Sequence, residues 1–120
     1  MSKPEVINID GVDYVKKDSN DIKNVDGLSY VIVRTYSAGV FAGYLESKSG
    51  KEVTLLHARR LWYWKGAASL SQAAVDGFSC PSECKFPCEV SRIDLTEAIE
   101  VLSCTQKAFE SIKSVKIWKA

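Results

Sequence analysis

Residues 28–64 read LSYVIVRTYSAGVFAGYLESKSGKEVTLLHARRLWYW, and this stretch decides the fold. It contains three runs rich in β-branched and aromatic residues, at 28–36, 40–48 and 51–64. The pairs Ala38-Gly39 and Ser49-Gly50 separate these runs and offer tight turns. Because short turns join antiparallel neighbours, the stretch predicts a three-stranded antiparallel meander.

Upstream of the meander, Asp10-Gly11 lies between the β-prone runs 5–9 and 12–15. A two-residue Asp-Gly link of this kind favours a β-hairpin. The following run 17–27, KDSNDIKNVDG, is polar and acidic and is typical of a surface loop.

Downstream, two short helices are expected. Ser69 and Gln72 have the spacing of a capping box, which predicts a helix over 70–76 that stops at Gly77. A second helix is expected over 105–115, where Thr105 is a candidate N-cap and one face is apolar, with Ala108, Phe109, Ile112 and Val115.

The remaining segments add strands. Residues 78–88 are expected to be loop and 89–95 a strand, and 116–118 is a candidate last short strand. Residues 96–103 also fit helical spacing, but we favour a strand. An antiparallel sheet with one apolar face needs a cover. The sequence therefore predicts a single α+β domain over 1–120: a small antiparallel sheet, made of the meander and an N-terminal hairpin, covered by two short α-helices.

Composition limits the functional classes. The chain has 120 residues, 46% of them hydrophobic, and a formal net charge of +1. This small charge argues against binding of duplex nucleic acid, which needs a strong basic excess. Neither a secretory signal nor an apolar run long enough to span a membrane is visible in the sequence. We therefore expect a cytoplasmic protein that does not bind membranes.

Four cysteines, at positions 80, 84, 88 and 104, raise the question of zinc. Structural zinc sites usually pair closely spaced cysteines across a longer loop. Here three cysteines recur at every fourth residue, with Pro81 and Pro87 between them. We expect thiols in a reducing cytoplasm and keep a zinc site as the alternative.

Sequence motifs for catalysis are largely missing. The chain has no phosphate-binding glycine loop, no dinucleotide fingerprint and no zinc-protease or serine-hydrolase motif. Its single histidine, His57, falls within an expected strand, where a packed or surface role is more common than base catalysis. We expect no catalytic residue, no metal and no cofactor.

An acid-free stretch carries the strongest hint of a ligand. No Asp or Glu occurs from Val53 to Val75, and within this range cations alternate with aromatic rings, at Arg59, Arg60, Trp62, Tyr63, Trp64 and Lys65. Period-two alternation would place Arg59, Leu61, Tyr63 and Lys65 on one face and Arg60, Trp62 and Trp64 on the other.

Such pairing suits a compact anionic nucleotide. Guanidinium groups bind phosphate oxygens in pairs, and aromatic rings stack on bases. Small residues at 66–68 and the hydroxyl groups of Ser69 and Ser71 at the helix start would let an anion approach the backbone. The competing interpretation is structural, because tryptophans near a strand end often fill a core or an interface and strand arginines often face solvent.

Two segments also carry a family resemblance. Residues 30–72, YVIVRTYSAGVFAGYLESKSGKEVTLLHARRLWYWKGAASLSQ, together with CKFPCEV at 84–90, resemble the first described kind of Thoeris anti-defence proteins of phages and prophages. The most specific pieces are VRTYSAGV at 33–40 and ARRLWYWKGAASLSQ at 58–72.

The resemblance implies a sponge. Such proteins bind the cyclic ADP-ribose-type signal (glyco-cyclic ADP-ribose) made by TIR-domain enzymes of Thoeris immunity, and they do not cleave it. Some also capture cyclic oligonucleotide signals. They form homo-oligomers, from dimers to assemblies such as hexamers, with sites where protomers meet. The resemblance therefore implies a small sheet with packed helices, working in the cytoplasm of an infected or lysogenic bacterial host.

The residue types fit that ligand class. A pyrophosphate would suit Arg34, Arg59 or Arg60, and an adenine would suit Tyr36, Trp64 or Phe78. Arg92, just beyond the resembling segment, is a weaker candidate. The full set of candidate ligand-binding residues is Arg34, Tyr36, Arg59, Arg60, Trp62, Trp64, Ser69, Phe78 and Arg92.

Two rival functions remain open from the sequence. One is an enzyme that cleaves a cyclic nucleotide with His57 as base, and the other is a phage adaptor that binds a host protein through exposed tryptophans. Under the sponge hypothesis, replacing Arg59 or Arg60 by alanine is expected to weaken binding more than folding.

Overall fold

The computed structural model describes residues 23–24 and 27–119, so the hairpin expected over 5–15 lies outside the described residues. Within this part of the chain the elements are β1 (Lys23–Asn24), β2 (Leu28–Thr35), β3 (Val40–Ser49), β4 (Glu52–Arg60), α1 (Leu70–Asp76), a 3-10 turn (Pro81–Glu83), β5 (Val90–Leu95), β6 (Ala98–Ser103) and α2 (Gln106–Ser114).

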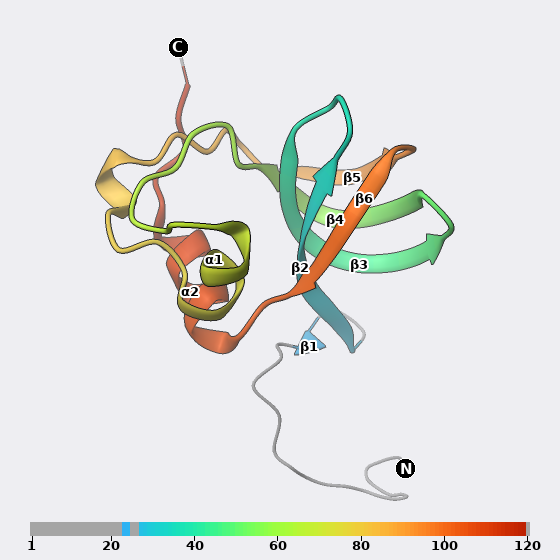
Figure 1. Ribbon diagram of the computed structural model, residues 1–120, viewed down its shortest axis with the longest axis horizontal. Helices are drawn as coiled ribbons and strands as arrows, with labels where there is room; N and C mark the ends of the chain where they lie inside the picture. The colour runs from blue at the N-terminus through green and yellow to red at the C-terminus, as the bar shows by residue number, and fades with distance from the viewer. Residues whose placement is uncertain (1–22, 25–26, 120) are drawn as a thin grey trace, which may run out of the picture.

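The sheet is an antiparallel meander with one return strand. Strands β2, β3, β4 and β5 pair in chain order, β6 pairs along the other side of β2, and the short β1 pairs the start of β2. The edge strands β5 and β6 are joined only by residues 96–97, so the two edges of this curved, open sheet meet at one end (Figure 1). The expected meander and the α+β class are both confirmed.

Alternation along the strands divides the interior into two clusters. Val31, Val33 and Leu55 point into the concave side of the sheet, where they pack with Phe41, Val53, Ala58, Leu95 and Ala98. Tyr30 and Ile32 point the other way and pack against the helices through Phe78, Phe86, Ala108 and Ile112. Strands β2 and β3 therefore have buried apolar residues on both faces, because a core cluster covers each face.

Strand β4 contains a bulge that resets its alternation. His57 has a φ of 51°, and the register with β3 shifts between Ala42 and Tyr44. Beyond the bulge Ala58 points into the concave cluster and Arg59 points toward the helices, so that both are buried. The sequence contains no glycine at this position that would signal a bulge.

The third strand of the meander ends earlier than expected. It was predicted to reach Trp64, but β4 ends at Arg60, and the last backbone bond to β3 runs from Leu61 N to Val40 O over 2.8 Å. Since β3 begins at Val40, residues beyond 61 have no strand to pair with in the sheet. The prediction that Tyr63, Trp64 and Lys65 alternate across the sheet was therefore wrong.

Three smaller expectations also change. The run 17–27, expected to be loop, includes β1, and 78–88 includes the 3-10 turn. Residues 116–118 form a single parallel bridge between Ile117 and Phe86 in place of a strand. The segment 96–103 does contain a strand, as favoured.

Both helices begin and end where their capping residues predict. The Ser69 hydroxyl accepts a hydrogen bond from Gln72 N, and the Thr105 hydroxyl accepts one from Ala108 N. Gly77, with φ 76°, ends α1, and a Cβ there would lie 2.4 Å from Ser111 Cβ on α2. The two helices therefore lie side by side on one side of the sheet (Figure 1). Neither described helix is long and apolar enough to cross a membrane.

Arg59 ties the sheet to this helical layer. Only 4% of the residue is exposed, and its guanidinium donates to the backbone oxygens of Pro87, Ile112, Phe86 and Val115 over 2.6–3.2 Å. Burial lowers the pKa of this guanidinium, which nevertheless stays charged at neutral pH. Arg59 therefore fixes the end of α2 and the segment before β5 against β4.

We expect Arg59→Ala to lower the free energy of unfolding by about 3 kcal/mol or more, because four buried carbonyls lose their donor. Arg34→Ala, at an exposed position that is ion-paired with Glu100, should cost less than about 1 kcal/mol. Urea unfolding of both variants measures the difference. A loss of under about 1 kcal/mol in Arg59→Ala would show that the carbonyls find other donors.

The Tyr30 hydroxyl generates a second prediction. The residue is 1% exposed, and its hydroxyl has no hydrogen-bond partner among the described residues. Tyr30→Phe should therefore raise the free energy of unfolding by about 1 kcal/mol, because it removes an uncompensated buried polar group.

The same substitution has a pH signature. Burial raises the pKa of the Tyr30 phenol above its ordinary value of 10.0. Above that pH the unfolded chain ionises first, so the wild type loses stability as pH rises. The advantage of Tyr30→Phe should therefore grow between about pH 8 and about pH 10.5 in urea unfolding. An advantage that stays constant over this range would contradict the assignment.

Candidate ligand-binding surface and pockets

The four arginines among the candidate ligand residues contact different parts of the chain. Arg59 is buried and uses four of its N–H groups on backbone carbonyls. Arg34 pairs with Glu100 over 3.0 Å, and Arg92 pairs with Glu46 over 2.6 Å. Arg60 lies over the Phe41 ring at 4.4 Å and donates to Ala38 O. Each guanidinium is thus engaged within the chain, and Arg59 is fully built into the interior.

The other candidates separate into three places. Trp64 lies beside Phe78, with ring centroids 6.3 Å apart, on the helical side of the molecule. The hydroxyl of Ser69 is occupied by the cap of α1. Tyr36, 79% exposed, lines a small pocket of about 230 Å³ with Lys51, Glu97 and Ile99, at the end where the sheet edges meet. The structure therefore brings Trp64 and Phe78 together but not the full predicted set.

Trp62 belongs to an exposed group of residues that we call the aromatic surface. Its members are the ring-bearing residues Trp62, Tyr63 and Trp118, together with Lys85 and Ile117. The indoles of Trp62 and Trp118 are stacked, with centroids 4.8 Å apart and planes at 17°. They are 57% and 42% exposed. The Lys85 ammonium lies 5.8 Å, 5.7 Å and 5.7 Å from the ring centroids of Trp62, Tyr63 and Trp118. A cation therefore stands among three accessible rings.

Backbone pairing holds this surface together. Tyr63 and Lys85 form an antiparallel bridge with bonds of 3.2 Å and 2.8 Å. Phe86 and Ile117 form a parallel bridge, with Trp118 N donating to Phe86 O over 2.9 Å. Three segments far apart in sequence are thereby joined into a small ladder. Arg59 of β4 anchors the same ladder, because its guanidinium donates a hydrogen bond to Phe86 O.

Charge at the aromatic surface is positive. None of its five members is acidic, and Lys116 and Lys119 flank Ile117 and Trp118 in sequence and are exposed. The nearest acidic residue in sequence to Lys85 on its own segment, Glu83, pairs with Lys65 over 3.1 Å. An exposed stacked pair beside free ammonium groups can hold a flat ring that carries negative charge.

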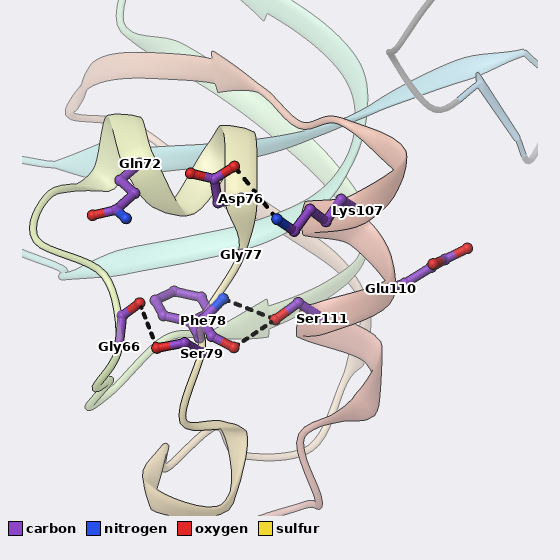
Figure 2. Close-up of a pocket in the computed structure, with 9 residues that line it drawn as sticks. All are labelled: Gly66, Gln72, Asp76, Gly77, Phe78, Ser79, Lys107, Glu110 and Ser111. Carbon is purple, nitrogen blue, oxygen red and sulfur yellow. Dashed lines mark hydrogen bonds and ion pairs between the residues drawn. The ribbon is translucent and has the colours of Figure 1, made fainter.

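A second feature, the helix pocket, lies between α1 and α2 (Figure 2). Its volume is about 540 Å³, within the usual size of small-molecule sites. It is lined by Gly66, Gln72, Asp76, Gly77, Phe78, Ser79, Lys107, Glu110 and Ser111. Phe78 and Gly66 were expected near a ligand, whereas the charged residues of the lining were not.

A third, smaller cavity lies beside the aromatic surface. It has a volume of about 220 Å³ and is lined by Arg59, Glu89, Lys113 and Ile117. The Lys113 ammonium pairs with the Glu89 carboxylate. Because Lys113 is already neutralised and Arg59 serves the backbone, this cavity offers little free positive charge to a phosphate.

The cysteines form no recognisable metal site in the described range. Cys84 and Cys104 are buried, Cys80 is partly buried and Cys88 is exposed, and no disulfide joins any of them within the described residues. Burial raises the pKa of the Cys84 thiol, which disfavours the thiolate needed for metal binding. No group of three or more His, Cys, Asp or Glu side chains converges among residues 23–24 and 27–119.

Sequence reasoning missed Lys85 and Trp118 as site residues. Backbone bridges bring both residues to Trp62, and these bridges join positions more than 20 residues apart. No local sequence pattern predicts such long-range pairing. The available signal was composition: KFPC at 85–88 and KIWK at 116–119 each place lysine near an aromatic ring.

The stacked indoles should give an exciton couplet in the far-ultraviolet circular dichroism spectrum. Trp62→Ala and Trp118→Ala should each abolish it, while costing less than about 1 kcal/mol of stability, because both rings are exposed. Trp64→Phe, which replaces a tryptophan outside the stack, is the matched control and should keep the couplet. Persistence of the couplet in Trp62→Ala would disprove the stacking.

Comparison with known proteins gives one match. Residues 28–112, from β2 into α2, match a family profile described as a domain of unknown function, DUF6948. No curated protein and no solved structure matches the chain. The matched range includes the meander, Arg59, the helix pocket and all of the aromatic surface except Ile117 and Trp118. The chain therefore belongs to the DUF6948 family, a domain of unknown function.

Proposed function

We propose that the protein binds and sequesters, without cleaving it, a compact cyclic ADP-ribose-type signal of the kind made by TIR-domain enzymes of Thoeris immunity. On this proposal it acts as an anti-defence sponge in the cytoplasm of an infected or lysogenic bacterial host. The observation that carries the proposal is the aromatic surface, where stacked, exposed indoles surround the ammonium of Lys85.

The chemistry of this surface matches both halves of such a ligand. An adenine can stack on the open face of an indole, which is worth about 1–3 kcal/mol per base. The pyrophosphate then lies within reach of Lys85 and the neighbouring Lys116 and Lys119. Lysine binds phosphate as a point charge, so the site does not need the paired guanidinium groups expected from the sequence.

The placement of the surface supports a functional role for it. Residues 61–89 form a long insertion between β4 and β5, whereas neighbouring strands elsewhere in the sheet are joined by two to four residues. Long connections in small domains usually carry function. The insertion holds Trp62, Trp64 and Phe78, and the pairing with residues 117–118 displays two of the rings.

Affinity argues for assembly of several copies. A sponge needs a dissociation constant near nanomolar, which corresponds to about −12 kcal/mol. One stack and a few ammonium groups cannot supply this after the costs of association. A second copy that closes over the ligand would add contacts and exclude water. The proposal therefore includes a homo-oligomer, a dimer or larger, with the ligand held between protomers.

A hydrolytic alternative has less support from the geometry. His57 lies on the β4 bulge, edge-on to Tyr44 with ring centroids 6.2 Å apart. His57 is not one of the five members of the aromatic surface, and none of these members is a His, Asp or Glu, so the surface does not itself supply an imidazole or carboxylate as general base.

The decisive experiment measures binding and recovery together. Glyco-cyclic ADP-ribose is titrated into the protein by calorimetry, the complex is heat-denatured, and the supernatant is analysed by mass spectrometry. We expect tight binding and quantitative return of intact signal. Converted product would favour the enzyme, and absence of binding to this signal and to cyclic oligonucleotides would favour the protein-binding adaptor.

Variants locate the site. Trp62→Ala and Lys85→Met should each weaken binding at least tenfold, because each removes a stack or a phosphate contact worth more than about 1.4 kcal/mol. Ile99→Ala, which shortens an exposed apolar side chain on β6, is the matched control and should leave affinity unchanged. Equal affinity in all three variants would place the ligand elsewhere.

A further inference from the structure

The helix pocket has the opposite electrostatic character to the aromatic surface. Its ionic lining consists of Asp76, Glu110 and one cation, Lys107. Asp76 Oδ1 lies 3.7 Å from Lys107 Nζ, so this pair is close to neutral. Glu110 also lines the pocket and adds an excess negative charge at its outer edge, where its carboxylate points away from Asp76 and Lys107 (Figure 2). A diphosphate would therefore meet net repulsion here.

Its polar groups are held in place by bonds to groups outside the cavity. Gln72 Oε1 accepts from Ala68 N over 2.8 Å, which leaves the amide NH₂ free to donate. Glu110 Oε2 accepts from Gln106 Nε2 over 2.7 Å and leaves its second oxygen free. The pocket thus presents fixed acceptors and donors together.

The walls are rigid because glycine brings backbones close. A Cβ at Gly66 would lie 2.6 Å from the backbone nitrogen atoms of Ser79 and Cys80. The Ser111 hydroxyl bridges Phe78 N and Phe78 O over 2.8 Å and 3.2 Å, and Ser79 Oγ donates to Gly66 O over 3.2 Å (Figure 2). The hydroxyl groups of Ser79 and Ser111 are therefore engaged with the backbone. The charged side chains and the Gln72 amide are the groups that can contact a ligand.

The geometry points to a second ligand site in the helix pocket, selective for a compact, hydroxyl-rich amine and against phosphate esters. Carboxylates only accept hydrogen bonds, whereas the Gln72 amide and Lys107 donate them. A ligand that faces both kinds of group needs functions that donate and accept, as hydroxyl groups do. The excess negative charge then favours an amino group over a phosphate.

This site is independent of the proposed sponge function. It is formed by Gly66, α1, α2 and the segment 77–79, whereas the aromatic surface is formed by residues 62–63, 85 and 117–118. Loss of one site should leave the other in place. The two proposals can therefore fail separately.

The test is a two-dimensional NMR titration of the ¹⁵N-labelled full chain with D-glucosamine, D-glucose and glucose 6-phosphate, each to roughly 20 mM, a range that detects millimolar binding. The three probes share one ring size and differ in charge. We expect glucosamine to shift the amides of Gly66, Gly77, Phe78, Ser79 and Ser111. Its affinity should exceed that of glucose 6-phosphate about fivefold or more, as one charge contact in water allows.

Two variants test whether the carboxylates cause the preference for glucosamine. Asp76→Asn and Glu110→Gln should each lower the preference for glucosamine over glucose 6-phosphate about fivefold. Glu52→Gln, which changes an exposed carboxylate at the start of β4, is the control and should not change this preference. Trp62→Ala should also leave these shifts intact. Equal or tighter binding of glucose 6-phosphate, or no shifts at the named amides, would overturn the proposal.

Discussion

The buried guanidinium of Arg59 is the interaction on which the rest of the structure depends. It projects from the end of β4 and donates to four carbonyls, two before β5 and two at the end of α2. A planar group with several N–H donors can satisfy carbonyls from two chain segments at once, which lysine could not do. The same bond to Phe86 O also supports the bridge that carries Ile117 and Trp118.

Much of the fold followed from local rules in the sequence. The turns at 38–39 and 49–50 and the runs of β-branched and aromatic residues that they separate were sufficient to predict the meander, and the caps at Ser69 and Thr105 to predict both helices. The extent of β4 was not predictable in this way. It depends on a non-glycine bulge at His57 and on where the partner strand β3 begins, and both are tertiary facts.

The candidate site was predicted in residue type but not in arrangement. Residues 59–65 combine cations and rings, as the sequence shows directly, but the sequence could not tell which cation is buried. Arg59 and Arg60 are neighbours, but the bulge sends one into the interior and the other over Phe41. The cation that stands among the rings is Lys85, which reaches Trp62 only because its segment pairs with Tyr63.

The aromatic surface and the helix pocket both depend on the insertion at 61–89. A meander needs only a short turn between β4 and β5, so the long insertion is not required to close the sheet. It is fixed at both ends, by the Leu61–Val40 bond and by Arg59 on Phe86 and Pro87. Between these points it places aromatic rings beside lysine on one flank, and on the other it forms the helix pocket together with α2. Because Arg59 anchors the insertion to the sheet, a ligand bound at either of the two proposed sites would meet a preformed surface, and the entropy cost of ordering this long loop would fall on folding and not on binding.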